Sequence, residues 1–237
     1  MISVIITPSA VFIHFHKTGG QFVNRLLLEY ASGARRVGYH LPRSETPPDS
    51  KKLPAFGFVR NPWDWYVSWY AFNILKPERN PIFRVTSASG TLGFNRTIEN
   101  LLRLGQPDSE SMRAHISSDL PATREGNLGS GITARVMAGM NEPERGYLTW
   151  LWRYMFAVNE RFDHVSFFRF ENLRPDFKSL LVKLAIPVSS SMSAVIDAAP
   201  VVNPSPHGHY KDYFNQELRE LVSAKDKEYI HAFDYMF

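Results

Sequence analysis

The chain has 237 residues, which is long enough for one globular domain with a full core or for two small ones. Hydrophobic residues make up 44% and charged residues 21%, as in ordinary globular proteins. Its 27 basic and 23 acidic residues leave a net charge of +4, and no cluster of Lys and Arg is long enough to follow a phosphate backbone, so we expect no nucleic-acid partner. The absence of cysteine excludes disulfides and cysteine-based metal sites. No apolar run approaches the roughly 20 residues that span a bilayer, and no secretion signal precedes the first strand. We therefore expect a cytoplasmic protein without a membrane partner.

The first predicted unit is a strand, a glycine turn and a helix. Residues 11–15 form a short apolar run rich in strand formers, and the turn Lys17-Thr18-Gly19-Gly20 ends it. After the turn, apolar residues recur at helical spacing at Phe22, Val23, Leu26 and Leu27.

A second strand and helix follow a Pro-rich loop at residues 42–54. The run 55–59 reads as a buried strand, and it leads directly into Arg60-Asn61-Pro62. Asn61 suits a helix N-cap and Pro62 suits the first helical position. The helix that follows is apolar nearly all round and is expected to be buried.

The remainder of the chain adds one more strand and several helices. Residues from about 76 to 146 are mixed in composition and form a variable, partly helical region on the acceptor side. We then predict a helix at 147–156, a strand at 165–170, a helix around 177–184, a Ser-rich linker at 189–193, a short helix, and a final helix around Leu218. Alternating strands and helices predict an α/β fold with a central, mainly parallel sheet flanked by helices.

Two segments at expected strand ends have the chemistry of anion sites, and ligands of such sheets lie beyond the carboxyl ends of the strands. In the first, glycines let the backbone approach an anion, the next helix directs its free N–H groups at it, and Lys17 adds a charge. In the second, Arg60 ends a strand and Ser68 follows eight residues later, so that both can converge on one phosphate. Taken alone, the first segment favours phosphate binding only slightly over an ordinary strand–helix turn. The second is explained at least as well by a capped helix with an arginine in a surface ion pair.

In combination these segments resemble the sulfotransferases that use 3′-phosphoadenosine 5′-phosphosulfate (PAPS). Residues 12–20, with Lys17-Thr18-Gly19-Gly20, are similar to the family's 5′-phosphosulfate loop, and Arg60 to Ser68 resembles its 3′-phosphate motif. Tyr39-His40-Leu41-Pro42 resembles the segment that carries the catalytic histidine of the cytosolic members. Residues 165–184, centred on Glu171-Asn172-Leu173, and the tail 203–237 also look like family segments, so that the resemblance covers roughly the first and last thirds of the chain.

The resemblance implies a single sulfotransferase domain over residues 1–237 with a P-loop-like three-layer fold. It implies transfer of a sulfuryl group from PAPS to the hydroxyl of a carbohydrate or other small alcohol or phenol, with 3′,5′-adenosine bisphosphate as product and no metal required. His40 would act as general base, with Glu45 as a weaker alternative, and Lys17 would assist catalysis. The donor would be bound by Lys17, Thr18, Gly19, Gly20, Gln21, Phe22, Arg60 and Ser68.

The chain also departs from the family pattern. Gln21 stands where a Thr or Ser usually follows the glycines, Gly38 replaces a Lys of the cytosolic members, and the C-terminal R-K-G segment is absent. The pattern is therefore closest to soluble, bacterial-type members related to the carbohydrate sulfotransferases. Two alternatives stay open: a non-catalytic sulfotransferase-like nucleotide-binding protein, and an ATP-dependent kinase of the P-loop type.

Overall fold

A computed structural model of the chain describes residues 4–76, 80–124, 131–198 and 206–237. These residues form two compact units. The first unit contains residues 4–60 and 154–198, and the second contains 61–76, 80–124, 131–153 and 206–237. Within the described ranges, no helix is both long enough and apolar enough to cross a bilayer.

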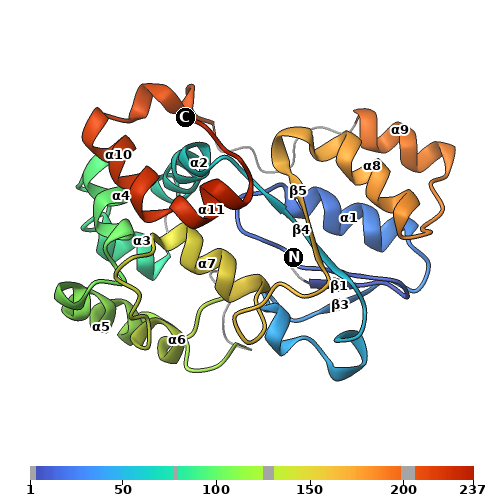
Figure 1. Cartoon of the computed structure of the whole chain (residues 1–237), viewed down its shortest axis with the longest axis horizontal. Coiled ribbons are helices and arrows are strands. Elements are labelled where there is room, and N and C mark those ends of the chain that lie inside the picture. Colours follow the sequence, from blue (N-terminus) through green and yellow to red (C-terminus); the bar gives the residue numbers. More distant parts are fainter. Residues whose placement is uncertain (1–3, 77–79, 125–130, 199–205) are drawn as a thin grey trace. The chain divides into compact units, whose positions relative to one another are not determined.

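The first unit is built on a five-stranded sheet with the order β3-β1-β2-β4-β5 (Figure 1). The strands are β1 (Val4–Ile6), β2 (Val11–Phe12), β3 (Arg35–Val37), β4 (Ala55–Val59) and β5 (Val165–Arg169). The pairs β2–β4 and β4–β5 are parallel, whereas β1 is antiparallel to both β2 and β3. Four strands therefore run in one direction and only β1 opposes them, which confirms the prediction of a mainly parallel central sheet.

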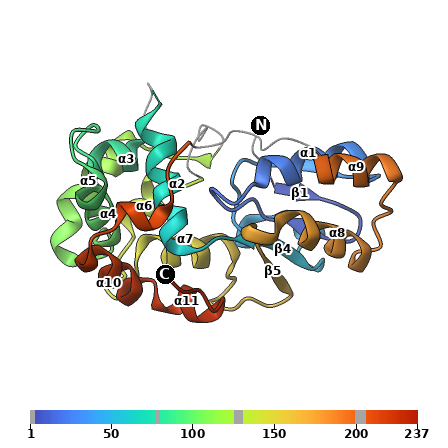
Figure 2. The same ribbon diagram turned by 90° about the horizontal axis from the view of Figure 1, so that it is seen from above.

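Three helices of the first unit cover one face of this sheet, as Figure 1 and Figure 2 show: α1 (Gly20–Tyr30), α8 (Leu173–Lys183) and α9 (Ser190–Ala198). Phe12, Phe56 and Phe58 point from the strands into the core that these helices close, because alternate residues of a strand face the same side. On the other face, the ring of Phe156 lies against Gly57, where a Cβ would be only 2.4 Å from the ring. The predicted α/β fold with flanking helices is confirmed.

The predicted strands at 55–59 and 165–170 match β4 and β5 closely, but three other details of the sheet differ. The strand expected at 11–15 pairs only over β2, although the Ile13 N–H still donates to the Phe56 carbonyl at 2.9 Å before the chain turns away. Strand β1 and the edge strand β3 were not predicted. The serines expected to form a linker at 189–193 instead begin α9, because the Ser189 hydroxyl accepts from the Met192 N–H at 3.1 Å and so caps the helix.

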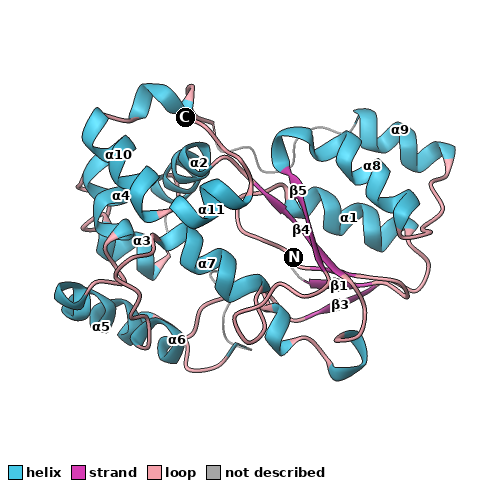
Figure 3. Ribbon diagram, in the orientation of Figure 1, coloured by secondary structure: helices cyan, strands magenta, loops and turns pink. Residues whose placement is uncertain are grey.

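The second unit is helical (Figure 3). Its helices are α2 (Pro62–Ile74), α3 (Pro81–Thr86), α4 (Phe94–Leu102), α5 (Glu110–Asp119), α6 (Ala134–Ala138), α7 (Tyr147–Phe156, whose last three residues belong to the first unit), α10 (Gln216–Lys225) and α11 (Lys227–Ala232). The Asn61 side chain accepts from the Trp63 and Asp64 N–H groups, which makes it the N-cap of α2 as predicted. The tryptophans of α2, at positions 63, 65 and 69, are buried in this unit.

A buried carboxylate joins three helical segments of the second unit. Asp226, fully buried between α10 and α11, accepts from the Tyr66 hydroxyl at 2.7 Å and from both the N–H and the hydroxyl of Thr149. Burial raises the pKa of Asp226, and the hydrogen bonds from Thr149 and Tyr66 oppose that rise. Because its partners satisfy both oxygens, we assign this group a structural role.

Candidate nucleotide and catalytic site

The turn between β2 and α1 has an unusual backbone. Lys17 has a φ of 60° and Gly19 a φ of 73°, so both adopt the left-handed conformation that a side chain disfavours. The buried Thr18 hydroxyl donates to the Phe15 carbonyl at 2.9 Å and closes the turn. A lysine held at positive φ is a strained position, and such positions occur preferentially at functional sites.

The two glycines of the turn are required by close contacts. A Cβ on Gly19 would lie 2.8 Å from Leu173 Cδ2, and a Cβ on Gly20 would lie 2.4 Å from the His14 ring. Gly20 begins α1, and among the described residues neither an acidic side chain in the first turn nor a side-chain cap competes for the N–H groups there. The backbone N–H groups, the positive end of the helix dipole and Lys17 together make this turn suited to an anion.

Arg60 comes next to this turn from the end of β4. Its Nη1 donates to the Lys17 carbonyl at 3.1 Å, and its guanidinium lies 4.6 Å from the centre of the Phe170 ring. Because β2 and β4 are neighbouring parallel strands, their carboxyl ends bring Lys17 and Arg60 to one edge of the sheet. The structure thus brings the Arg60 guanidinium to the backbone of the turn that carries Lys17.

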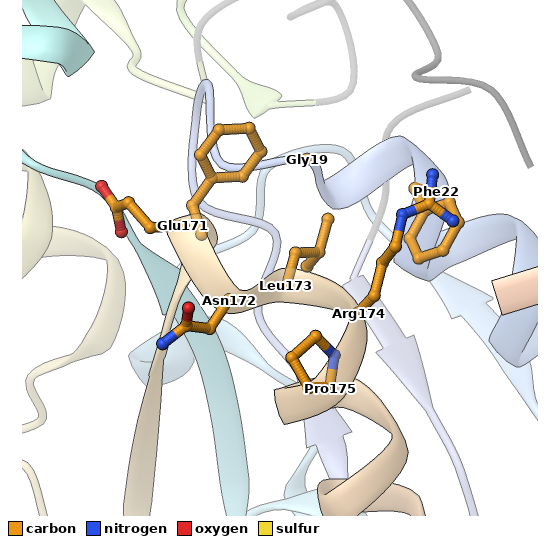
Figure 4. A pocket seen from close by; sticks show the side chains of 8 residues that line it. Gly19, Phe22, Glu171, Asn172, Leu173, Arg174 and Pro175 are labelled. Atoms are coloured by element: carbon orange, nitrogen blue, oxygen red, sulfur yellow. The ribbon is translucent and has the colours of Figure 1, made fainter. Parts of the chain in front are cut away.

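A pocket of about 260 Å³ opens beside the same turn (Figure 4). It is lined by Gly19 and Phe22 from the turn and α1, and by residues 170–175 from the end of β5 and the start of α8. The Arg174 guanidinium lies over the Phe22 ring, 5.3 Å from its centre, while Glu171 points away from that ring. The two aromatic rings of this pocket, those of Phe22 and Phe170, lie beside an anion-binding turn and can hold the flat base of a nucleotide.

His40 lies beside the turn within a cluster of imidazoles. Its ring stacks on that of His16 with 3.8 Å between centroids and 8° between planes, and the His14 ring lies 4.9 Å away at a steep angle. His40 Nδ1 lies 3.1 Å from the His14 carbonyl oxygen, and its backbone has a φ of 42°. Because His16 directly precedes Lys17, this stack places His40 next to the anion-binding turn.

Burial controls the protonation of this cluster. It lowers the pKa of His40 to about 4, although the hydrogen bond to the His14 backbone opposes the change. Burial, together with the nearby His40, also lowers the pKa of His14 well below its ordinary value. Both imidazoles are therefore neutral at pH 7, and His40 is in the form that can accept a proton.

The remaining predicted residues lie in different places. Phe22 is buried and lines the pocket, and Gln21 lies half-buried in the first turn of α1. Ser68 is buried on α2 in the second unit, and its pairing with Arg60 stays a prediction. Glu45, the alternative base, is exposed.

Sequence reasoning missed three side chains of this site: Phe170 and Arg174 as pocket residues, and His16 as the partner of His40. The segment 165–184 resembled the family, yet the resemblance assigned it no contact to the donor. Phe170 directly follows β5, the parallel neighbour of β4, so its place at a carboxyl strand end was the available signal. The stacking partner of His40 had no signal, because the two residues are far apart in the chain.

Neither a protein-family model nor a curated protein matches the chain. Among solved structures, the chain is similar to the crystal structure of mouse sulfotransferase SULT7A1 complexed with PAP. The similarity covers 95% of this chain and 89% of the mouse chain, with a TM-score of 0.53 and 14% sequence identity. The fold of this chain is therefore that of a sulfotransferase.

Proposed function

We propose that this chain is a sulfotransferase that moves a sulfuryl group from PAPS to the hydroxyl of an acceptor. The observation that carries the proposal is the meeting of Arg60 with the Lys17 turn, next to an aromatic pocket and beside His40. A donor with a phosphosulfate, a second phosphate and a base needs this set of groups close together. The structural neighbour that was crystallised with PAP supports the same class of donor.

Each part of the donor has a suitable partner in the chain. In the proposed complex, the Lys17 ammonium and the N–H groups at Thr18, Gly19 and Gly20 hold the 5′-phosphate, with the Gln21 amide beside them. The pocket at Phe22 accepts the base, since the Phe22 and Phe170 side chains line it beside the turn. Arg60 binds the 3′-phosphate, and Ser68 is proposed to share it.

The transfer step needs a base for the acceptor and a cation for the leaving group. In the proposal, His40 takes the hydroxyl proton as the acceptor oxygen bonds to sulfur. When the bond between sulfur and the bridging oxygen breaks, Lys17 neutralises the charge on the 5′-phosphate that leaves. In-line positioning of the two substrates contributes the rest of the acceleration, as in phosphoryl transfer.

A thermal-shift comparison of 3′,5′-adenosine bisphosphate, AMP and ATP tests the donor assignment. A ligand that binds only the folded state raises stability by mass action, by about 2.7 kcal/mol at 100 times its dissociation constant. We expect selective stabilisation by the bisphosphate. Equal stabilisation by AMP would refute the 3′-phosphate site, and selective stabilisation by ATP with magnesium would favour the kinase alternative.

Two substitutions separate binding from catalysis. Arg60→Ala should weaken bisphosphate affinity about 10- to 100-fold, because it removes charge-assisted hydrogen bonds worth about 1.5–3 kcal/mol. The exposed Arg161, paired with Asp163 at 3.9 Å, provides a control, and Arg161→Ala should leave the affinity unchanged. His40→Ala should retain donor affinity and lose about 10²–10⁴-fold in turnover. Donor binding without transfer to any hydroxyl in the unmodified chain would instead show a binding module.

A further inference from the structure

The His40 imidazole is enclosed on several sides by side chains that the proposed mechanism does not use. His16 covers one face of the ring at 3.8 Å, and the His14 and Tyr39 rings each lie 4.9 Å away at steep angles. His40 itself is 2% exposed. Among the described residues, the titratable rings in contact with that of His40 are those of His14, His16 and Tyr39, and Lys17 follows His16 directly in the chain.

The hydrogen bond of His40 decides which of its nitrogens can act. The His14 carbonyl oxygen, 3.1 Å from Nδ1, can only accept a hydrogen bond, so Nδ1 carries the proton of the neutral ring. The lone pair of the neutral imidazole is then on Nε2. A carbonyl contact, however, fixes only one atom of the ring, and rotation about that hydrogen bond would still change the direction of Nε2.

The stacked ring of His16 supplies the missing restraint. Two rings stacked at 3.8 Å, with 8° between them, keep their planes parallel, and a tilt of either ring would break the stack. Their geometry does not suit a shared metal ion, because lone pairs that lie in two parallel planes do not converge on one point. The stack also excludes water from the face of His40 that it covers.

We propose that His16 is a positioning residue for the base: its ring fixes the plane of the His40 imidazole and covers it, so that Nε2 is directed and kept free for the acceptor hydroxyl. This inference rests on the proposed function for its catalytic meaning, but the geometry of the ring is testable without any substrate. It predicts that the shape of the side chain at position 16 matters more than its charge.

Two variants at position 16 separate shape from charge. His16→Ala uncovers the His40 ring, so we expect turnover to fall about 10- to 100-fold, the loss typical of a misplaced catalytic group. Solvent should also reach the ring and move the pKa of His40 from about 4 toward its ordinary 6.5. The acid limb of the kcat/KM profile should then move to higher pH. His16→Phe keeps a flat ring in the stack, so it should retain the turnover, and the acid limb of its kcat/KM profile should stay at the same low pH as in the wild type.

The pH profile of sulfuryl transfer and the binding of 3′,5′-adenosine bisphosphate are measured for the wild type and both variants, with the exposed His231→Phe as control. In a His40→Asn background, His16→Ala should cost nothing further, because it acts through His40. Equal shifts in His16→Ala and His16→Phe would show that the imidazole acts through its charge and would overturn the proposal, as would no change in either.

Nuclear magnetic resonance of ¹⁵N-histidine-labelled protein tests the same claim without donor or acceptor. Long-range ¹H–¹⁵N correlations should show neutral His40 protonated at Nδ1, with a titration near pH 4 in the wild type and in His16→Phe and a higher one in His16→Ala. If the wild type shows this pattern but neither binds the bisphosphate nor transfers a sulfuryl group, the proposed function fails and the positioning role stands. An Nε2-protonated His40, or an unshifted titration in His16→Ala, would overturn the positioning role itself.

Discussion

At the scale of single residues, the candidate site requires glycines whose neighbours leave no room for a Cβ atom. Gly20 begins α1 directly against the His14 ring, and that ring is itself held between Asn24, 3.4 Å from its Nδ1, and His40. A methyl group at position 20 therefore has no free space. The turn can pack this closely against the His14 ring because Gly20 has no side chain.

Gly20→Ala should thus be strongly unfavourable. The new Cβ would lie 2.4 Å from the His14 ring, and such overpacking costs about 1–3 kcal/mol. We expect a lower midpoint of urea unfolding and weaker binding of 3′,5′-adenosine bisphosphate. Gly93→Ala is the control for overpacking, since a Cβ there meets no atom within 4 Å. Gly93 is the N-cap of α4, so the unfolding midpoint should change only slightly, and binding of the bisphosphate should not change. A Gly20→Ala protein as stable as the wild type would contradict the packing described for the turn.

At the scale of elements, α2 depends on the cap that directly follows Arg60. Asn61 Oδ1 accepts from the Trp63 N–H at 3.1 Å and from the Asp64 N–H at 3.4 Å, while Nδ2 donates to the Met236 carbonyl at 2.9 Å. One side chain thus begins the buried helix and also attaches the C-terminal segment of the second unit.

Asn61→Ala should lower the free energy of unfolding by about 1 kcal/mol, the usual cost of losing an N-cap. Asn61→Asp retains a capping oxygen but removes the donor to the Met236 carbonyl, so we expect its unfolding midpoint in urea to lie between those of the wild type and Asn61→Ala. Equal stability of Asn61→Ala and the wild type would show that the cap contributes nothing.

The sequence predicted those elements whose signals are local. The buried strand 55–59, the Asn61-Pro62 helix start and the helix 147–156 were all predicted at or near their observed bounds, because apolar runs and capping residues act within a few positions. The strand β1 is only three residues long, and β3 begins with two exposed arginines, so neither has a distinct hydrophobic pattern. The meeting of Lys17 with Arg60 was predicted from strand ends, whereas the stack of His16 on His40 results from tertiary packing alone.

At the scale of the whole molecule, the buried histidines should make stability depend on pH. Burial places the pKa of His40 near 4, below its value of about 6.5 in the unfolded chain. Between these pH values the unfolded chain binds a proton that the folded chain does not, so stability falls as pH decreases from 6.5 to 4. The pKa of His14 is lowered too and acts in the same direction.

Urea unfolding measured at intervals between pH 4 and 7 should show this loss, with a slope of about 1.4 kcal/mol per pH unit for each proton taken up. His40→Gln cannot take up that proton, so its stability should change less steeply over the same interval. His231→Gln, at an exposed position, should leave the slope as in the wild type. The same slope in the wild type and in His40→Gln would contradict the burial of the His40 imidazole, whatever the opposing contribution of Asp226.

The first unit combines two segments that are far apart in the sequence, since Ala55 on β4 pairs with Val165 on β5. A ribosome therefore releases the Lys17 turn and Arg60 long before the strand and helix that complete the wall of Phe170 and Arg174 have been synthesised. The nascent chain must keep β4 paired only with β2, without β5, while the second unit's helices emerge, and that unit is incomplete until α10 and α11 are made. Synthesis must thus be nearly complete before either half of the protein can finish folding, and a chain interrupted near residue 153 would leave both halves without their final partners.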